Sequence, residues 1–213
     1  MRSAHSHSVV EWGVAQCALP GQTVSGDQYV MHAAPNAVLI AVMDGLGHGA
    51  EAATAAEVAA ATMERHFGEP LLSLLGRCHA ALKHTRGAAI SVASVSATSD
   101  VMTWVGVGNV EGIILRASDK TAAAREHIPL FPGVAGYRLP SVRASVTPIH
   151  RGDLVIFYTD GIRGDVLFEP ITRESPELIA RRICNEYRKG TDDALVFVAR
   201  YLGSKSRSTT VTR

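Results

Sequence analysis

Cysteine and net charge are both scarce in this chain. It has three cysteines, Cys17, Cys78 and Cys184, and their wide spacing matches no metal-binding or redox motif. A sparse and odd set argues against a disulfide scaffold and favours a reducing compartment. The formal net charge is +1, so the chain lacks the basic field with which a nucleic-acid-binding protein neutralises phosphates.

Long hydrophobic segments are absent as well. Residues 1–8 contain no apolar stretch of the kind that a secretory signal requires. The longest apolar runs, such as 37–43, are far shorter than the roughly 20 residues that cross a membrane as a helix. We therefore expect a cytoplasmic protein with no membrane partner.

The chain does contain enough apolar material for one packed domain. Hydrophobic residues make up 46% of its 213 residues and charged residues 19%, and this length suits a single compact domain better than two. We expect a flexible N-terminus over residues 1–8, one catalytic domain over 9–202 and a disordered basic tail over 203–213. We expect the protein to act as a monomer.

Hydrophobic periodicity and turn residues predict the order of the elements. Helices are expected over 50–66, from Leu71 to a stop at Gly87, and from an N-cap at Ser175 to Gly190. Strands do not alternate regularly with these helices, so a doubly wound parallel sheet is disfavoured and an α+β fold with antiparallel sheets is favoured. The expected strands cover 9–18, 28–34, 37–43, 90–97, 101–107, 112–117, 142–147, 154–158 and 194–200.

Aspartates stand at the ends of several of these apolar strands. They are Asp27, Asp44, Asp160 and the pair Asp192–Asp193. Each Asp-Gly pair alone is more often a simple turn. Several buried carboxylates together would be costly without cations, and ligand sets made only of oxygen select Mg²⁺ or Mn²⁺ over zinc. The pattern therefore predicts a divalent metal site.

One glycine pattern offers a different enzyme class. Gly45-x-Gly47-x-x-Ala50 follows a buried strand and opens a helix, as in a dinucleotide-binding turn. In that class Asp44 would face a pyrophosphate with no compensating cation. The acidic residue expected about 20 positions later would also fall in or at the end of a helix, near 64–66. We keep a dinucleotide-binding oxidoreductase as the second alternative.

Four motifs, taken together and in order, resemble one enzyme family. They are Ser-Gly-Asp at 25–27, Val-Met-Asp-Gly-Leu-Gly-His-Gly at 42–49, Gly-Asp-Leu-Val-Ile-Phe-Tyr-Thr-Asp-Gly-Ile at 152–162 and Thr-Asp-Asp-Ala-Leu-Val-Phe at 191–197. The chain thereby resembles PPM-type (PP2C-like) metal-dependent serine/threonine phosphatases, in their bacterial SpoIIE/RsbX-like branch. The resemblance covers about residues 9–202.

The resemblance implies a four-layer αββα sandwich and a site for two Mn²⁺ or Mg²⁺ ions. It makes Asp44 the bridging ligand, with the Gly45 carbonyl as a further ligand, and gives Asp44 and Asp160 the catalytic roles. Gly26 and Ala194 depart from residues common in relatives, Glu and Thr, which leaves the surroundings of the ions open. The implied metal ligands are Asp27, Asp44, Gly45, Asp160, Asp192 and, with a less certain role, Asp193.

The resemblance also implies the reaction and the partner. A hydroxide held between two metal ions would attack phosphoserine or phosphothreonine, so no protein nucleophile is needed. The short chain resembles feedback phosphatases of the stressosome pathway, which implies phosphorylated STAS-domain scaffold or antagonist proteins as substrates. The first alternative is a catalytically weak phosphatase fold that serves as a binding module. His48 as a proton donor and Arg163 as a phosphate ligand are weaker candidates than structural roles for both.

Overall fold

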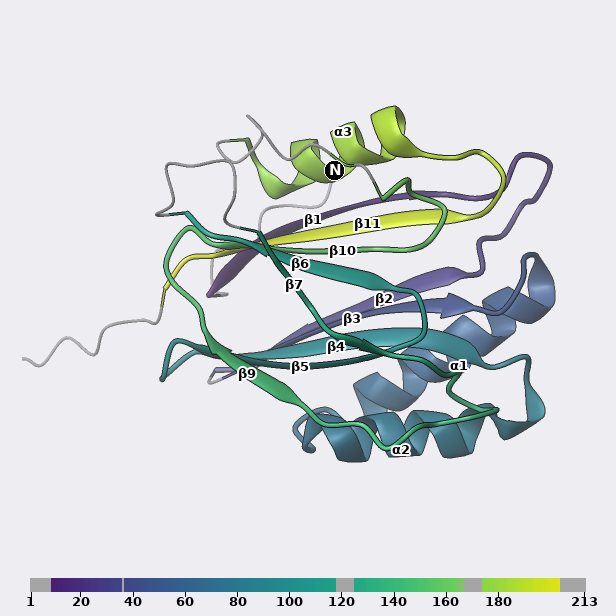
Figure 1. Ribbon diagram of the computed structural model, residues 1–213, viewed down its shortest axis with the longest axis horizontal. Coiled ribbons are helices and arrows are strands. Elements are labelled where there is room, and N and C mark those ends of the chain that lie inside the picture. The colour runs from purple at the N-terminus through teal and green to yellow at the C-terminus, as the bar shows by residue number, and fades with distance from the viewer. Residues whose placement is uncertain (1–8, 36, 118–124, 165, 167–173, 204–213) are drawn as a thin grey trace, which may run out of the picture.

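Two β-sheets pack face to face, and helices cover their outer faces (Figure 1). The computed structural model describes residues 9–35, 37–117, 125–164, 166 and 174–203. The expected flexible N-terminus and all of the expected basic tail except Gly203 lie outside these residues. The first sheet has the order β1 (Val10–Cys17), β11 (Ala194–Tyr201), β10 (Leu154–Tyr158), β6 (Glu111–Leu115) and β7 (Arg125–His127).

The second sheet forms the other inner layer. Its order is β2 (Asp27–Ala33), β3 (Ala37–Gly45), β4 (Ala88–Ser96), β5 (Val101–Val107) and β8 (Leu130–Phe131), and β9 (Ser145–Pro148) also pairs with β5. Helices α1 (Ala50–Arg65) and α2 (Leu71–Ala81) lie on its outer face, whereas α3 (Pro176–Tyr187) lies on the first sheet. The expected α+β sandwich of four layers is confirmed.

The strand pattern follows the predicted periodicity closely. Strands β5 and β10 have the expected bounds, and β3 is buried on both faces. Ile40 and Val42 face the core between the sheets, whereas Leu39, Ala41 and Met43 face α1 and α2. This alternation explains why the sequence of β3 is a continuous apolar run.

Several features differ from the sequence-based expectation, among them β9, which was expected over 142–147, and α3, which ends at Tyr187 before Gly190. Helix α2 ends at Ala81 and a 3₁₀ turn over Leu82–His84 follows, so the stop comes before Gly87, which has a φ of +79° in the turn into β4. Strands β7 and β8 were not expected because two or three residues give no periodic signal. Strand β8 pairs with β5 in the parallel sense, the exception in sheets whose other ladders over the described residues are antiparallel.

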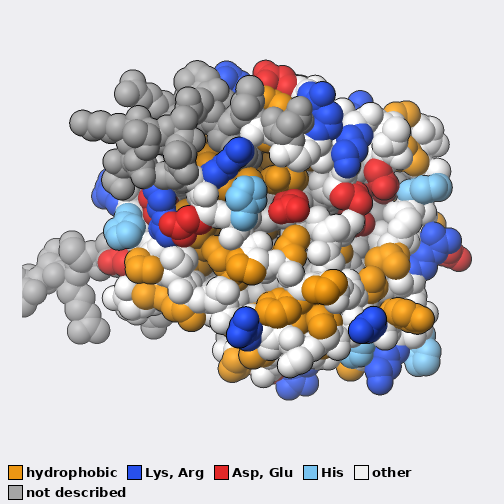
Figure 2. Space-filling view, viewed as in Figure 1, with side chains coloured by type: hydrophobic (Ala, Val, Ile, Leu, Met, Phe, Trp, Pro, Cys, Tyr) orange, Lys and Arg blue, Asp and Glu red, His pale blue; other side chains and the backbone are white. Residues whose placement is uncertain are grey.

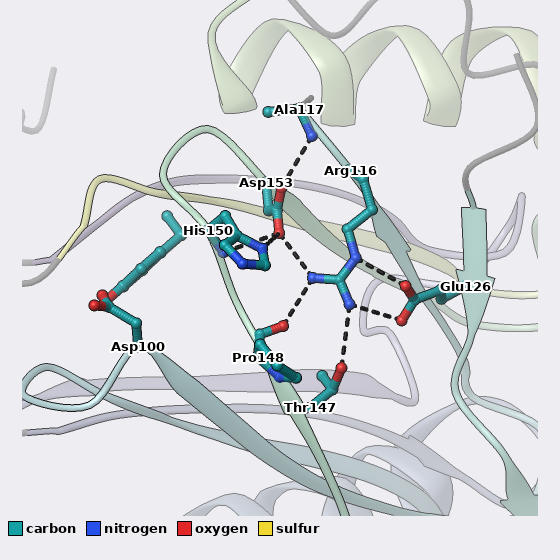
Figure 3. A network of polar contacts seen from close by, with 9 residues as sticks. Asp100, Arg116, Ala117, Glu126, Thr147, Pro148, His150 and Asp153 are labelled. Carbon is teal, nitrogen blue, oxygen red and sulfur yellow. Dashed lines mark hydrogen bonds and ion pairs between the residues drawn. The ribbon is translucent and has the colours of Figure 1, made fainter. Parts of the chain in front are cut away.

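An arginine fastens the two sheets together at one end of the sandwich (Figure 3). Arg116, just beyond β6, donates to Glu126 of β7 and to the buried carboxylate of Asp153 at 2.7–2.9 Å. It also donates to the Pro148 carbonyl at 2.8 Å and to the Thr147 hydroxyl at 3.1 Å, both on β9 of the second sheet. Because Asp153 precedes β10 and Asp160 follows it, this network lies at the opposite end from Asp160.

The approach of α1 to the end of β3 gives a stability prediction. A Cβ on Gly45 would lie 2.1 Å from the carbonyl oxygen of Ala52, so Gly45→Ala forces two backbone segments apart. We expect it to lower the free energy of unfolding by about 1–3 kcal/mol. Gly76→Ala in α2 is the control, because nothing lies within 4 Å of its added Cβ and helix propensity should raise stability by about 0.5–1 kcal/mol. Urea unfolding of both variants checks this, and equal effects would contradict it.

Candidate metal centre

Aspartates from both sheets meet at the end of the sandwich away from Arg116. Antiparallel pairing of β2 with β3 places Asp27 directly opposite Asp44. Asp160 lies two residues beyond β10, and Asp192 and Asp193 immediately precede β11, which pairs with β10. The structure thus brings together every aspartate that the sequence singled out, and acidic side chains also gather toward this end in Figure 2.

Asp27 is the most deeply buried of these carboxylates. It is 1% exposed and accepts a hydrogen bond of 2.8 Å from the Thr159 hydroxyl, which comes from the other sheet. Burial, followed by the charge of Asp44, raises the pKa of Asp27 from its ordinary value of 3.8 to about 8, although the bond from Thr159 opposes the shift. Its charged form therefore lacks sufficient compensation in the protein alone.

The pKa values of Asp44 and Asp160 are raised as well. Burial and the nearby charges of Asp160, Asp192 and Asp193 raise the pKa of Asp44 to about 7. Burial and Asp192 also raise the pKa of Asp160, opposed by Lys189 and by a 2.7 Å hydrogen bond from the Asn109 amide. Carboxylates whose pKa values are raised by one another form a site with unbalanced negative charge.

Asp193 has a different environment from its neighbours. It is 3% exposed, and its two carboxylate oxygens accept the N–H groups of Leu19 and Gly26, each at 2.7 Å. It therefore holds the segment before β2 in place. Asp192 is less buried and accepts the N–H of Asp193 at 2.8 Å.

The two glycines that follow Asp44 and Asp160 are required by close backbone packing. A Cβ on Gly161 would lie 1.8 Å from the Asp193 carbonyl oxygen, and Gly45 has the corresponding approach to Ala52. These glycines let the strand ends and α1 converge beside the aspartates.

The donor set suits a hard divalent cation. Over the described residues, no three His, Cys, Asp or Glu side chains form a ready-made site for a single ion. The carboxylates instead repel one another and bind local donors such as Thr159 and Asn109. Mg²⁺ keeps several waters and needs only one or two carboxylates, so oxygen groups spaced in this way fit hydrated Mg²⁺ or Mn²⁺.

Three residues at this site carry no signal strong enough to find from sequence: Asn109, Thr159 and Lys189. Asn109 holds Asp160, Thr159 holds Asp27, and Lys189 is the cation whose charge lowers the pKa of Asp160. Their positions depend on pairing between distant segments, which local pattern does not reveal.

His48 and Arg163 were the weaker candidates for a proton donor and a phosphate ligand. His48 is exposed in the loop between β3 and α1. The Arg163 guanidinium lies over the Tyr187 ring, 5.4 Å from its centroid, and donates to the Glu186 carbonyl at 3.0 Å. These contacts support a structural role for Arg163.

The dinucleotide alternative is wrong. Strand β3 pairs in the antiparallel sense with both β2 and β4, and α1 leads into α2 rather than to a parallel neighbour of β3. A dinucleotide-binding turn requires the parallel βαβ unit. The glycines after Asp44 belong instead to the loop beside the aspartates.

Comparison with known proteins identifies the family. Residues 34–202 match the family model described as Stage II sporulation protein E (SpoIIE). The chain belongs to the SpoIIE family. Phosphoserine phosphatase RsbX from Bacillus subtilis (strain 168) is 27% identical to this SpoIIE-family chain over 149 residues, which cover 70% of the chain and 73% of RsbX.

Solved structures share the fold of this SpoIIE-family chain. One from work on the bacterial stressosome is 32% identical, with a TM-score of 0.84, and the match covers 90% of this chain and 99% of that one. RsbX in complex with magnesium is 22% identical, with a TM-score of 0.80 and coverage of 90% and 94%. The catalytic domain of the phosphatase PstP with two manganese ions is 14% identical, with a TM-score of 0.64 and coverage of 91% and 98%.

Among the described helices of this SpoIIE-family chain, none is both long and apolar enough to cross a membrane.

The buried hydroxyl of Thr159 gives a prediction about stability. Thr159→Val keeps the shape but removes the donor to Asp27 and the acceptor for the Leu195 N–H. We expect a loss of about 1–3 kcal/mol in the free energy of unfolding, because the buried N–H of Leu195 loses its acceptor. The control is Thr54→Val on the exposed face of α1, which should change stability by about 0.5 kcal/mol or less. Urea unfolding of both variants in EDTA decides, and equal losses would refute the role of Thr159.

The raised pKa values predict how the metal-free protein responds to pH. Asp27 and Asp44 hold protons more tightly in the folded than in the unfolded chain. This contribution to stability is complete below about pH 4 and is lost as the pH rises through about 7 to 8. Urea unfolding in EDTA should therefore show that the free energy of unfolding declines between pH 5 and 8. Asp27→Asn should make this decline shallower. Stability that rises over this range in the wild type, or a slope unchanged in the variant, would refute the assignment.

Proposed function

We propose that this SpoIIE-family chain is a metal-dependent protein phosphatase that hydrolyses phosphoserine or phosphothreonine in a partner protein. The observation that carries the proposal is the cluster of aspartates from both sheets, in which burial and mutual repulsion raise the pKa of Asp27, Asp44 and Asp160. Divalent cations would neutralise the charge of such a cluster and so stabilise its ionised form. Membership of the SpoIIE family and likeness to the phosphoserine phosphatase RsbX support this function.

The aspartates have different roles in this proposal. Asp27 and Asp44 from the second sheet, and Asp160 and Asp192 from the first, would hold two Mg²⁺ or Mn²⁺ ions, with the Gly45 carbonyl as a further ligand. Bound divalent cations supply charge neutralisation for a phosphate group and lower the pKa of a water molecule. Asp193 positions the chain before β2 through the N–H groups of Leu19 and Gly26, and its part as a metal ligand stays a prediction.

Neighbouring side chains orient the carboxylates and set the charge at the rim. Thr159 and Asn109 restrict Asp27 and Asp160 through single hydrogen bonds of 2.8 and 2.7 Å. Lys189 is exposed. Its backbone N–H donates to the Gly161 carbonyl at 2.8 Å, and this bond keeps the residue beside Asp160. An ammonium group there is placed to pair with a phosphate oxygen of an incoming phosphoprotein.

We infer that the partner is a phosphorylated STAS-domain protein of a stressosome, encountered in the cytoplasm by a monomeric enzyme. Likeness to RsbX and to a structure from work on the bacterial stressosome supports this partner. The alternative is a catalytically weak module that binds the same partner without turnover. Metal-dependent release of phosphate separates the two.

The carboxylate cluster predicts which substitutions remove activity. Asp44→Asn and Asp160→Asn should each lower kcat/KM for p-nitrophenyl phosphate with Mn²⁺ by about 100-fold or more, because each removes a charged metal ligand. The fold should persist, because neutral side chains relieve repulsion among the aspartates. The control is Glu64→Gln, an exposed carboxylate on α1, which should leave kcat/KM unchanged. EDTA should abolish wild-type turnover, and full activity in either aspartate variant would disprove the mechanism.

A second measurement tests the partner. The wild type should release phosphate from a phosphorylated STAS-domain protein with a kcat/KM well above that for phosphorylated casein. Asp160→Asn should bind the phosphorylated STAS-domain protein without releasing phosphate. Equal rates on both substrates would remove the partner assignment but leave the phosphatase activity standing. Binding without turnover by the wild type would favour the binding module.

A further inference from the structure

Two cysteines that lie 167 positions apart in sequence meet beside the aspartate cluster. The sulfur atoms of Cys17 and Cys184 are 3.5 Å apart. Cys17 is the last residue of β1, and Cys184 lies on the face of α3 that packs against the first sheet. The sequence spacing gave no sign of this pair.

The backbone on both sides holds the two thiols in register. A Cβ on Gly13 of β1 would lie 2.3 Å from the backbone of Glu177, so the start of α3 rests directly on this strand. From Glu177 to Cys184 the helix rises roughly 10 Å, and from Gly13 to Cys17 the strand extends roughly 13 Å. Helix and strand therefore run side by side to the point where the sulfurs meet. A disulfide bond of about 2.05 Å needs the two sulfurs to approach by only about 1.5 Å.

The residues on either side of Cys17 contact the aspartate cluster. The side-chain amide of Gln16 donates to the Asp27 carbonyl at 2.7 Å. The N–H of Leu19 donates to the Asp193 carboxylate at 2.7 Å. Cys17 itself pairs in register with Ala194, the residue after Asp193. Movement of Cys17 toward α3 therefore pulls on the contacts that position Asp27 and Asp193.

We propose that Cys17 and Cys184 are a reversible dithiol site, and that their disulfide lowers the affinity of the aspartate cluster for divalent cations. The reactant is a small disulfide such as glutathione disulfide. Cys17, which is half-exposed, attacks one sulfur of the reagent and releases one glutathione, and Cys184 then attacks the Cys17 sulfur and releases the second. The two cysteines lose two electrons, the reagent is reduced to two thiols, and both protons end on glutathione.

The burial of the Cys184 thiol determines the rate of disulfide closure. Cys184 is buried, and burial followed by the contact with Cys17 raises the pKa of its thiol to about 12. Since the thiolate is the attacking form, closure should be slow at neutral pH and faster as the pH rises. At neutral pH the pair therefore closes only during sustained exposure to an oxidant.

The chemical part is tested by incubating the full chain with glutathione disulfide, alkylating it and mapping the peptides. We expect a Cys17–Cys184 cross-link, a fall from three free thiols to one, and restoration by dithiothreitol. Cys17→Ser and Cys184→Ala should abolish the cross-link. Cys78→Ser is the matched control, because Cys78 is buried in α2 beside the Ala59 carbonyl and should not affect the cross-link. No cross-link in the wild type, or a persistent glutathione adduct on Cys17, overturns the dithiol site.

The coupling between the disulfide and cation affinity is tested by isothermal titration calorimetry, in which Mn²⁺ is titrated into the reduced and the oxidised wild type. This part rests on the proposed metal site. We expect the dissociation constant to rise about 10-fold or more on oxidation, as when groups that orient metal ligands are disturbed. Reduced and oxidant-treated Cys17→Ser should bind Mn²⁺ alike. Equal affinity in both wild-type forms overturns the coupling. If the reduced protein binds no Mn²⁺, the proposed function fails and the coupling with it, while peptide mapping still decides the dithiol site.

Discussion

Negative charge confined between two β-sheets is the constraint on which this structure depends. Strand pairing brings Asp27 and Asp44 face to face, and the meeting of the two sheets adds Asp160, Asp192 and Asp193. Desolvation and mutual repulsion then oppose ionisation, which raises the pKa of Asp27 to about 8. This arrangement destabilises the metal-free protein, and divalent cations bound there would remove the repulsion. Under the proposed function, folding and metal binding would therefore be linked through the same few carboxylates.

The contacts that shape this site also join the two sheets. Thr159 of the first sheet donates to Asp27 of the second, and Asp193 accepts the N–H of Gly26, which precedes β2. Neither contact is local in sequence, since each connects the start of β2 with the region between β10 and β11. Packing between the sheets, through residues such as Phe157, Phe197 and Ile40, brings these segments within hydrogen-bonding distance. The geometry of the candidate site is in this sense a product of the whole sandwich.

Much of this architecture could be predicted from the sequence, because period and turn chemistry mark each long element. The run at 37–43 indicated a strand buried on both faces, and Ser175 with Pro176 indicated the start of α3, where the Ser175 hydroxyl accepts the Leu178 N–H. The aspartates that gather were also identified, because each follows or precedes an apolar strand. Their roles as metal ligands remain predictions.

The remaining features depend on contacts between distant segments. The partners of Asn109 and Thr159, the reason for Gly45 and the meeting of Cys17 with Cys184 could not be inferred from local pattern, because each needs the register of two strands or the docking of a helix. The strands β7 and β8 are too short to leave a periodic signal. Such features become visible only when the sheets are assembled.

The arginine network at the far end has a mechanical consequence for the whole molecule. Arg116 joins β6, β7 and β10 to β9 through several charged and neutral acceptors around one guanidinium that is 14% exposed. The two layers are therefore joined at both ends of the sandwich, by one guanidinium at this end and by the contacts of Thr159 and Asp193 at the other. At the arginine end the buried carboxylate of Asp153 pairs with a cation that belongs to the chain itself, so the layers are held together there without any ion taken from solution.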